Sequence, residues 1–404
     1  MTKNKQIATK IMTRKCADKL TGEHIVIPDG YTAIEAKAFA SRRGVASISL
    51  PGSLTMIGYG AFDSCSSLKN ITIPVNVTEI GGWAFYATAL TSIVVPASVT
   101  EIGDYAFERC DSLTDITVSA DNQNYASFEG VLFNKEKTTL IFYPPSKADK
   151  TYTIPDTVSK IGDKAFEGNA FLTKVTIPES VRRIESKAFA GCSDLTEMFI
   201  PASVEHIHQY VFNHCDALES IIISEDNPNY TSEHKVLFNK DKTMLIEYSD
   251  REMEDNYVIP DSVKIIDWFA FCGCESLKSV VIPEGVESIG MHAFEGCRGL
   301  TEIVLPSSMT LIDHDTFSKC RNLRKITIPD SIIEVDIGPI IEAHPFYGCH
   351  PQAVATYKGK TYHAEELFSR IPYTNLPKEF YEAFSQTPPN PNALNVIVSI
   401  GSDE

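Results

Sequence analysis

Positive charge is scarce in this chain of 404 residues. It has 36 Lys and Arg residues against 53 Asp and Glu residues, which leaves a formal net charge of −17. This balance repels phosphate backbones and anionic lipid headgroups, and no local cluster of basic residues offsets it. We therefore expect no nucleic acid partner.

Long apolar runs are also missing. No stretch of the sequence resembles a membrane span, so we expect no membrane insertion. Residues 1–20 are rich in basic side chains but lack the apolar core of a secretory signal. These residues make a cytoplasmic location one alternative, and the sequence by itself does not decide the location.

Sequence motifs of catalysis are missing as well. The chain contains no nucleophile elbow, phosphate-binding loop or dinucleotide fingerprint. We expect a protein that is not an enzyme, with no catalytic residues, no cofactor and no bound metal. One alternative is an enzyme whose site lies near the C-terminus, around His344, His350 and His363.

The sequence does contain an internal repeat. Short apolar runs end in a proline that recurs every 23 residues, once every 22, within three groups. A second marker, a Phe that usually follows Ala, recurs at a fixed distance after the proline. The prolines are Pro28, Pro51, Pro74, Pro96, Pro155, Pro178, Pro201, Pro260, Pro283, Pro306 and Pro329; the matching phenylalanines are Phe39, Phe62, Phe85, Phe107, Phe166, Phe189, Phe212, Phe271, Phe294 and Phe317.

The two gaps between these groups each contain one longer unit of 36 residues. The segments Ser119–Tyr125 and Ser224–Tyr230 resemble each other, and so do Val131–Thr138 and Val236–Thr243. Apolar residues on both sides of a polar turn, as at Val131–Phe133 and Leu140–Tyr143, predict a β-hairpin in each long unit.

A unit of 23 residues is too small to bury its own apolar side. It must therefore cover its neighbour, and the result is a solenoid with one continuous core. The alternation in Ile71, Thr72 and Ile73 puts two residues inward and one outward, as a strand requires. We predict a mainly β solenoid with short helices and turns, built from 13 coils.

The unit resembles the BspA-like leucine-rich repeats. The residues that carry the resemblance are Leu68, Ile71, Ile73 and Pro74, followed by positions of the Val77, Ile80 and Ala61-Phe62 types, and the match covers about residues 25–329. Members of that family are mostly bacterial or protist surface proteins thought to bind host or matrix proteins. The resemblance therefore implies a leucine-rich repeat fold, a protein partner, a location at the cell surface or outside the cell, and a role in adhesion or host interaction.

The ten cysteines follow the repeat, and eight of them lie three residues after the Phe of a unit. Thr88 and Asn169 hold the same place in other units, which indicates a small, partly polar side chain packed against a turn. Neighbours in register, such as Cys192 and Cys215, would have parallel Cβ atoms about 4.8 Å apart, outside the usual separation for a disulfide. We expect buried free thiols.

Other polar clusters carry weaker signals. Cys272-Gly-Cys274 lacks the spacing of a redox or zinc motif. His206, His208 and His214 form a histidine cluster that we interpret as solvated turn residues. Asp121–Asn124 and Asp226–Asn229 lack the glycine and distal glutamate of an EF-hand, so we interpret them as turns.

The outward strand residues, two before each proline or its equivalent, suggest a binding surface. The first seven are mostly hydroxyl-bearing, whereas the next five would form an apolar stripe: Phe199, Ile222, Val258, Val281 and Val304. Glu197 and Glu302 belong to a polar rim beside it. Such a patch is typical of a partner site, although β-branched residues also favour strands for their own sake.

We divide the chain into an N-terminal cap (1–24), the repeat solenoid (25–339), a small α+β C-terminal cap (340–386) and a tail (387–404). The C-terminal cap should contain a hairpin around Lys358-Gly359 and helices over 364–370 and 377–385. The sequence favours a non-enzymatic protein that binds a protein partner through its sheet face. A structural spacer or self-associating scaffold is the alternative, and the oligomeric state does not follow from the sequence.

Overall fold

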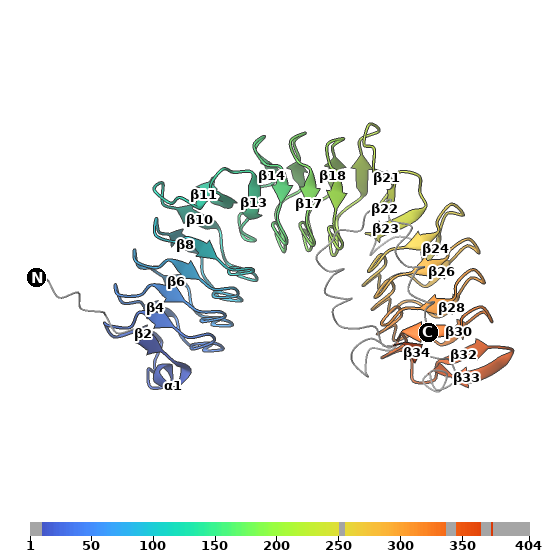
Figure 1. Cartoon of the computed structure of the whole chain (residues 1–404), viewed down its shortest axis with the longest axis horizontal. Coiled ribbons are helices and arrows are strands. Elements are labelled where there is room, and N and C mark those ends of the chain that lie inside the picture. The colour runs from blue at the N-terminus through green and yellow to red at the C-terminus, as the bar shows by residue number, and fades with distance from the viewer. Residues whose placement is uncertain (1–9, 250–254, 337–344, 365–372, 375–404) are drawn as a thin grey trace, which may run out of the picture. The chain divides into compact units, whose positions relative to one another are not determined.

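The computed structural model describes residues 10–249, 255–336, 345–364 and 373–374. Within these ranges nearly all regular structure is β-strand, and the single helix, α1 (Arg14–Ala17), has four residues. The chain divides into two compact units, Met1–Leu172 (unit 1) and Thr173–Glu404 (unit 2). Each unit is a solenoid of stacked coils (Figure 1), which confirms the predicted fold class.

Most coils contribute one strand to each of two parallel ladders. We call these the long-strand face and the short-strand face. In unit 1 the long-strand face consists of β2 (His24–Val26), β4 (Ser47–Ser49), β6 (Asn70–Ile71), β8 (Ser92–Val95), β10 (Asp115–Val118) and β14 (Thr151–Thr153). The short-strand face consists of β1 (Ile11–Met12), β3 (Ala33–Ile34), β5 (Met56–Ile57), β7 (Glu79–Ile80), β9 (Glu101–Ile102), β13 (Thr139–Phe142) and β15 (Lys160–Ile161).

Unit 2 repeats this arrangement. Its long-strand face holds β16 (Lys174–Thr176), β18 (Glu197–Ile200), β20 (Ser220–Ile223), β24 (Asn256–Val258), β26 (Ser279–Val281), β28 (Glu302–Val304), β30 (Lys325–Thr327) and β32 (Val354–Tyr357). Its short-strand face holds β17 (Arg183–Ile184), β19 (His206–Ile207), β23 (Met244–Tyr248), β25 (Ile265–Ile266), β27 (Ser288–Ile289), β29 (Leu311–Ile312), β31 (Glu334–Asp336) and β34 (Tyr373–Thr374).

Register is constant from coil to coil. Ile25 pairs with Ile48, and Ile48 pairs with Ile71, so equivalent positions of neighbouring units stack in columns. The inward column is buried and the outward column is exposed, as the alternation in the sequence predicts.

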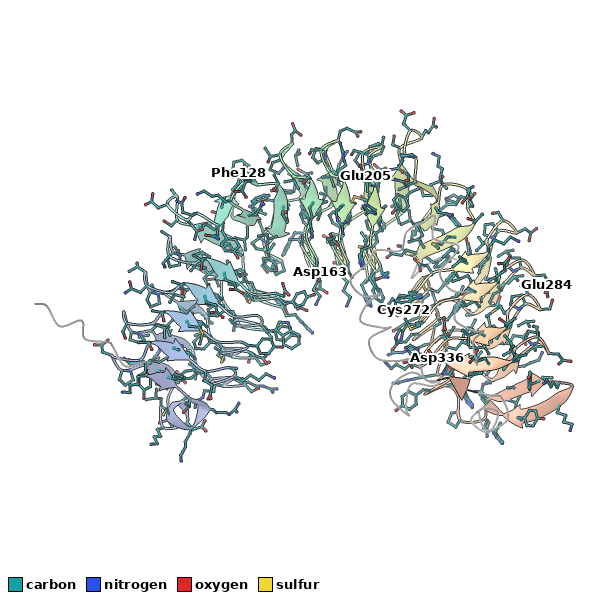
Figure 2. The ribbon with its side chains drawn as sticks, in the orientation of Figure 1. Phe128, Asp163, Glu205, Cys272, Glu284 and Asp336 are labelled. Carbon is teal, nitrogen blue, oxygen red and sulfur yellow. The ribbon has the colours of Figure 1, made fainter. Side chains whose placement is uncertain are left out.

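A third face, which the sequence analysis missed, lies around the repeated Phe. The amides of Lys37, Phe39 and Ser41 donate to the carbonyls of Tyr59, Ala61 and Asp63 in the next coil. Lys37 and Ser41 have left-handed backbones, with φ of 57° and 66°. We call this the turn face; the labelled Asp163 and Cys272 mark it in Figure 2, at the opposite edge of the coils from Phe128 in unit 1 and from Glu284 in unit 2.

The core of each unit is a stack of the repeated aromatic rings. Phe39, Phe62 and Phe85 are fully buried, and their ring centroids lie 5.6 and 5.5 Å apart in consecutive pairs. Phe271 and Phe294 stack in unit 2 with centroids 4.7 Å apart. Offset stacking of this kind adds to the free energy gained from burying the rings.

The cysteine column lines this core, and the expectation of free thiols is confirmed. All ten cysteines are free; seven are buried, and Cys16, Cys272 and Cys349 are half-buried. The Cys65 thiol donates to the Phe39 carbonyl of the preceding coil at 3.2 Å. Burial raises the pKa of the Cys65 thiol to about 11, which makes it a structural group and not a nucleophile.

The two long units form the predicted hairpins. In unit 1, β11 (Tyr125–Phe128), β12 (Val131–Asn134) and β13 pair antiparallel; in unit 2, β21 (Tyr230–Glu233), β22 (Val236–Asn239) and β23 do the same. Both begin with a buried asparagine. The Asn122 side chain donates to the carbonyls of Pro96 and Val99 and accepts from the amides of Asn124 and Tyr125. The Asp121–Asn124 segment therefore forms a turn, as expected.

Strand pairing continues into both predicted caps. β1 pairs with β3, and β32 pairs with β30. β32 and β33 (Lys360–His363) form the hairpin expected around Lys358-Gly359, where both residues have positive φ. The helices expected over 364–370 and 377–385 and the tail lie outside the described residues, apart from Ala364.

In unit 2 a buried side-chain carboxyl, that of Glu247, accepts a turn-face hydrogen bond where the hairpin interrupts the regular coils. The Phe212 amide, which would otherwise bond a backbone carbonyl of the next coil, donates to Glu247 Oε1 at 2.9 Å. Burial raises the pKa of Glu247 to about 7. The Glu247 carboxyl of the folded protein is therefore protonated below about pH 7 and charged above it.

We expect replacement of Asn122 by Ala to lower the free energy of unfolding by about 3 kcal/mol, because it leaves several buried backbone groups without partners. Asn124→Ala is the control, since the Asn124 side chain is exposed and only two residues away. Urea unfolding followed by circular dichroism measures both variants. Equal midpoints for the two variants would contradict this role of Asn122.

We expect Glu247→Gln to stabilise the protein at pH 8 but not at pH 4. The amide oxygen keeps the bond from Phe212, and the variant has no charge to bury. Because the pKa of Glu247 rises from 4.5 in the unfolded chain to about 7 in the folded one, the wild type loses stability relative to the variant between these values. The difference reaches about 3 kcal/mol above pH 7. Urea midpoints of both proteins from pH 4 to 8 test this, and a difference that does not vary with pH would refute it.

Candidate partner-binding surface

The residues of the predicted stripe all project from the long-strand face of unit 2. Phe199 lies on β18, Ile222 on β20, Val258 on β24, Val281 on β26 and Val304 on β28. Their exposed fractions range from 41% for Ile222 to 66% for Val258. Each side chain projects outward from a strand of the ladder, and Phe199, Val281 and Val304 each lie between two buried inward neighbours.

A hairpin divides these residues into two groups. Phe199 and Ile222 face each other on paired strands, and we call them the first apolar patch. Beyond β20 the turn between β21 and β22 takes the place of the next long strand, because the Ile221 amide donates to the His234 carbonyl. Val258, Val281 and Val304 follow on the far side as the second apolar patch. The sequence analysis expected one continuous stripe, since the path of the hairpin cannot be read from the repeat.

The expected polar rim lies beside both patches. Glu197 and Glu302 are exposed two residues before Phe199 and Val304 on the same strands. Glu197 pairs in register with Lys174, and Glu302 lies 3.3 Å from Lys325 Nζ. The rim therefore alternates acidic and basic side chains.

Unit 1 provides an internal comparison for the first patch. Val94 and Thr117 face each other on β8 and β10, as Phe199 and Ile222 do on β18 and β20. The two pairs are 105 residues apart in the sequence. The same backbone position thus carries a larger apolar pair in unit 2.

The prediction that three histidines are solvated turn residues is wrong for two of them. His206 lies on β19 and His208 is buried, whereas His214 lies on the turn face with φ of 61°. His350 accepts a hydrogen bond from the Gln352 amide, and His363 ends β33. His344 lies outside the described residues.

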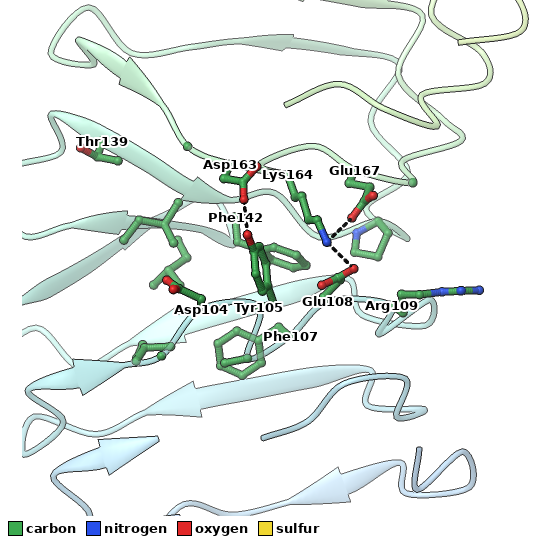
Figure 3. Close-up of a pocket in the computed structure, with 18 of the residues that line it drawn as sticks. Asp104, Tyr105, Phe107, Glu108, Arg109, Thr139, Phe142, Asp163, Lys164 and Glu167 are labelled. Atoms are coloured by element: carbon green, nitrogen blue, oxygen red, sulfur yellow. Dashed lines mark hydrogen bonds and ion pairs between the residues drawn. The ribbon is translucent and has the colours of Figure 1, made fainter. Parts of the chain in front are cut away.

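The largest cavity that we describe opens on the turn face of unit 1, at the hairpin (Figure 3). Its volume is about 520 Å³, and its walls include the rings of Tyr105, Phe107 and Phe142. Ionic and hydrogen-bonded contacts span it: Tyr105 donates to Asp163, and Lys164 Nζ lies 2.7 Å from Glu108 Oε1. The sequence analysis did not anticipate it.

A substitution distinguishes the two hairpins at this cavity. Phe142 stands 105 residues before Glu247, so the apolar ring occupies the position of the carboxylate that bonds Phe212. Among the described residues, the amide of Phe107 makes no bond like that of Phe212. The equivalent hollow in unit 2 is much smaller, about 20 Å³.

The lining of this cavity is more apolar than polar. Two of its carboxylates are engaged, Glu108 with Lys164 and Asp163 with Tyr105. Burial, together with the bond to Asp163, raises the pKa of Tyr105, so the phenol stays protonated. None of these groups is poised as a nucleophile or general base.

No helix within the described ranges has the length and apolar character that a membrane crossing needs. The one described helix has four residues.

Comparisons with solved structures find bacterial leucine-rich repeat proteins. One from Eubacterium ventriosum is 26% identical, covers 86% of this chain and 89% of its own, and has a TM-score of 0.52. A leucine-rich cell surface protein from Faecalibacterium prausnitzii is 24% identical, covers 87% and 91%, and has a TM-score of 0.44. The pneumococcal vaccine antigen PcpA is 19% identical, covers 88% and 79%, and has a TM-score of 0.47. None of the curated proteins matches the chain.

The family model for the BspA type leucine-rich repeat region, in six copies, matches residues 9–139, 139–243 and 248–375. These ranges cover nearly all of the repeat, including both hairpin-bearing units. The chain therefore belongs to the family of BspA-type leucine-rich repeat proteins.

Proposed function

We propose that this protein binds a protein partner through the long-strand face of unit 2, with the first apolar patch as the anchor. The observation that carries the proposal is the pair of Phe199 and Ile222, exposed side by side on paired strands. Large apolar side chains on a rigid exposed surface are typical of the energetic centre of a protein interface.

The rim defines the chemistry of the partner. Glu197 is exposed beside Phe199, and Lys174 is opposite Glu197 on the neighbouring strand. A partner that inserts apolar side chains and surrounds them with charges of both signs would match this surface. Family membership makes adhesion or host interaction the biological setting that we propose.

The contrast with unit 1 distinguishes the first apolar patch from a simple preference for strand-forming residues. Val94 and Thr117 are both β-branched, so they already favour a strand. At the same pairing in unit 2 Phe199 replaces Val94 and Ile222 replaces Thr117, and strand preference alone does not account for these larger apolar side chains. Phe and Ile on a solvent-exposed face offer more apolar area for a partner than Val and Thr do.

We expect the double variant Phe199→Asp/Ile222→Asp to reduce partner binding by about tenfold or more, because it removes the anchor and buries charge in the interface. The matched control is Val94→Asp/Thr117→Asp, which makes the same change on the equivalent strands of unit 1. Pull-down with each protein as bait, quantified by mass spectrometry, measures capture, and circular dichroism verifies folding.

Partners captured by the wild type and the control, but lost from the unit 2 variant, would support the proposal. Equal capture by both variants would refute it. Capture of no partner, with a mass in light scattering that grows with concentration, would favour the self-associating scaffold.

A further inference from the structure

Two consecutive coils of unit 2 bring together three residues that can bind a metal. His292 comes from the coil of Phe294, and His314 and Asp315 come from the coil of Phe317. One donor atom from each residue lies within 4.8 Å of the other two. Within the described ranges this is the only such group of three His, Cys, Asp or Glu side chains.

The register of the turn face explains the cluster. His292 and Asp315 both stand two residues before the buried Phe of their coils, and both have left-handed backbones, with φ of 58° and 53°. Stacking places equivalent side chains of neighbouring coils one above the other. His314 is adjacent in sequence to Asp315 and reaches the same point from inside, being only 6% exposed.

Carboxylates stand behind both imidazole rings. His314 Nδ1 lies 2.8 Å from Asp336 Oδ2, in a pair that is almost completely buried. His292 Nδ1 lies 2.8 Å from Glu295 Oε2, at an angle outside ideal hydrogen-bond geometry. Lys319 holds Glu295 in turn, at 2.5 Å. A carboxylate beside an imidazole orients the ring, which is the usual arrangement behind zinc-binding histidines.

Ring packing also fixes the two histidines. His292 stacks on Phe269 with centroids 4.7 Å apart and planes 7° apart. His292 and His314 meet at 82° with centroids 5.6 Å apart. The rings are therefore held near one another in advance, and an ion has only to draw the donor atoms slightly closer.

We propose that His292, His314 and Asp315 bind one Zn²⁺ ion, with water completing the coordination. Two imidazole nitrogens and one carboxylate oxygen are a donor set that zinc accepts, whereas Mg²⁺ and Ca²⁺ prefer oxygen alone. The ion fastens one coil of unit 2 to the next on the turn face. This role is independent of the partner surface, which lies on the long-strand face.

The test uses the full chain freed of metal by a chelator and titrated with ZnCl2 by calorimetry. The wild type should bind one equivalent, and its Tm should rise with zinc concentration because the ion binds only the folded site. His292→Gln and Asp315→Asn, both at half-exposed positions that tolerate change, should each weaken binding by about tenfold or more. His206→Gln is the control and should bind as the wild type does.

Co²⁺ in place of Zn²⁺ provides a second measurement. Nitrogen and oxygen ligands should give weak visible bands without the intense thiolate absorption that cysteine ligands produce. Failure of the wild type to bind Zn²⁺, thiolate absorption with Co²⁺, or equal affinity in His292→Gln, Asp315→Asn and the wild type would each overturn the proposal.

Discussion

The structure depends on one constraint: each coil must stack on the next without a shift of register. The parallel pairing of Ile25, Ile48 and Ile71 shows this on the long-strand face. On the turn face, the backbone amide of Phe39 donates a hydrogen bond to the carbonyl of Ala61, and the amide of Phe62 donates to that of Ala84. Once register is constant, every position of the unit becomes a column. A residue type that suits one coil then suits them all, which is why the sequence repeats.

The regular stacking of coils is interrupted at the two hairpin-bearing units. These are also the places where a buried carboxyl and a cavity occur. Before each 36-residue unit, among the described contacts, the amides of Phe107 and Phe212 do not bond a carbonyl of the next coil as those of Phe39 and Phe62 do. In unit 2 the side chain of Glu247 accepts the hydrogen bond from the Phe212 amide, and the carboxyl of Glu247 is buried as a result. Unit 1 has Phe142 at that position and leaves a cavity instead. The buried carboxyl of Glu247 gives the Phe212 amide an acceptor, whereas in unit 1 a cavity lies beside the equivalent amide of Phe107.

The sequence was sufficient for the features that recur and insufficient for those that occur once. The proline and Phe periods predicted the strands, and the column of Cys65 and its equivalents predicted the buried thiols, because core positions are dictated by packing. The turn face escaped prediction because its left-handed residues, such as Lys37 and Tyr105, are not glycines. The division of the apolar stripe escaped because the path of a hairpin depends on tertiary contacts such as that of Ile221 with His234. The histidine pair escaped because its members are 22 residues apart and meet only through register.

A comparison of equivalent positions in the repeat distinguishes residues that the fold requires from residues that are free to serve binding. At positions 105 residues apart the two units share their backbone, so differences between them cannot be required by the fold. Val94 of unit 1 differs from Phe199 of unit 2 on the long-strand face. Within unit 2, Lys187 and His292 hold the same place in their coils on the turn face, and they also differ. Inward positions such as Phe107 and Phe212 do not differ, since the core tolerates little change. Selection for binding can therefore act on an exposed residue that differs from the others in its column, because such a change does not disrupt the solenoid. In unit 2 Phe199 and His292 are two such residues, and they lie on separate faces of the coils.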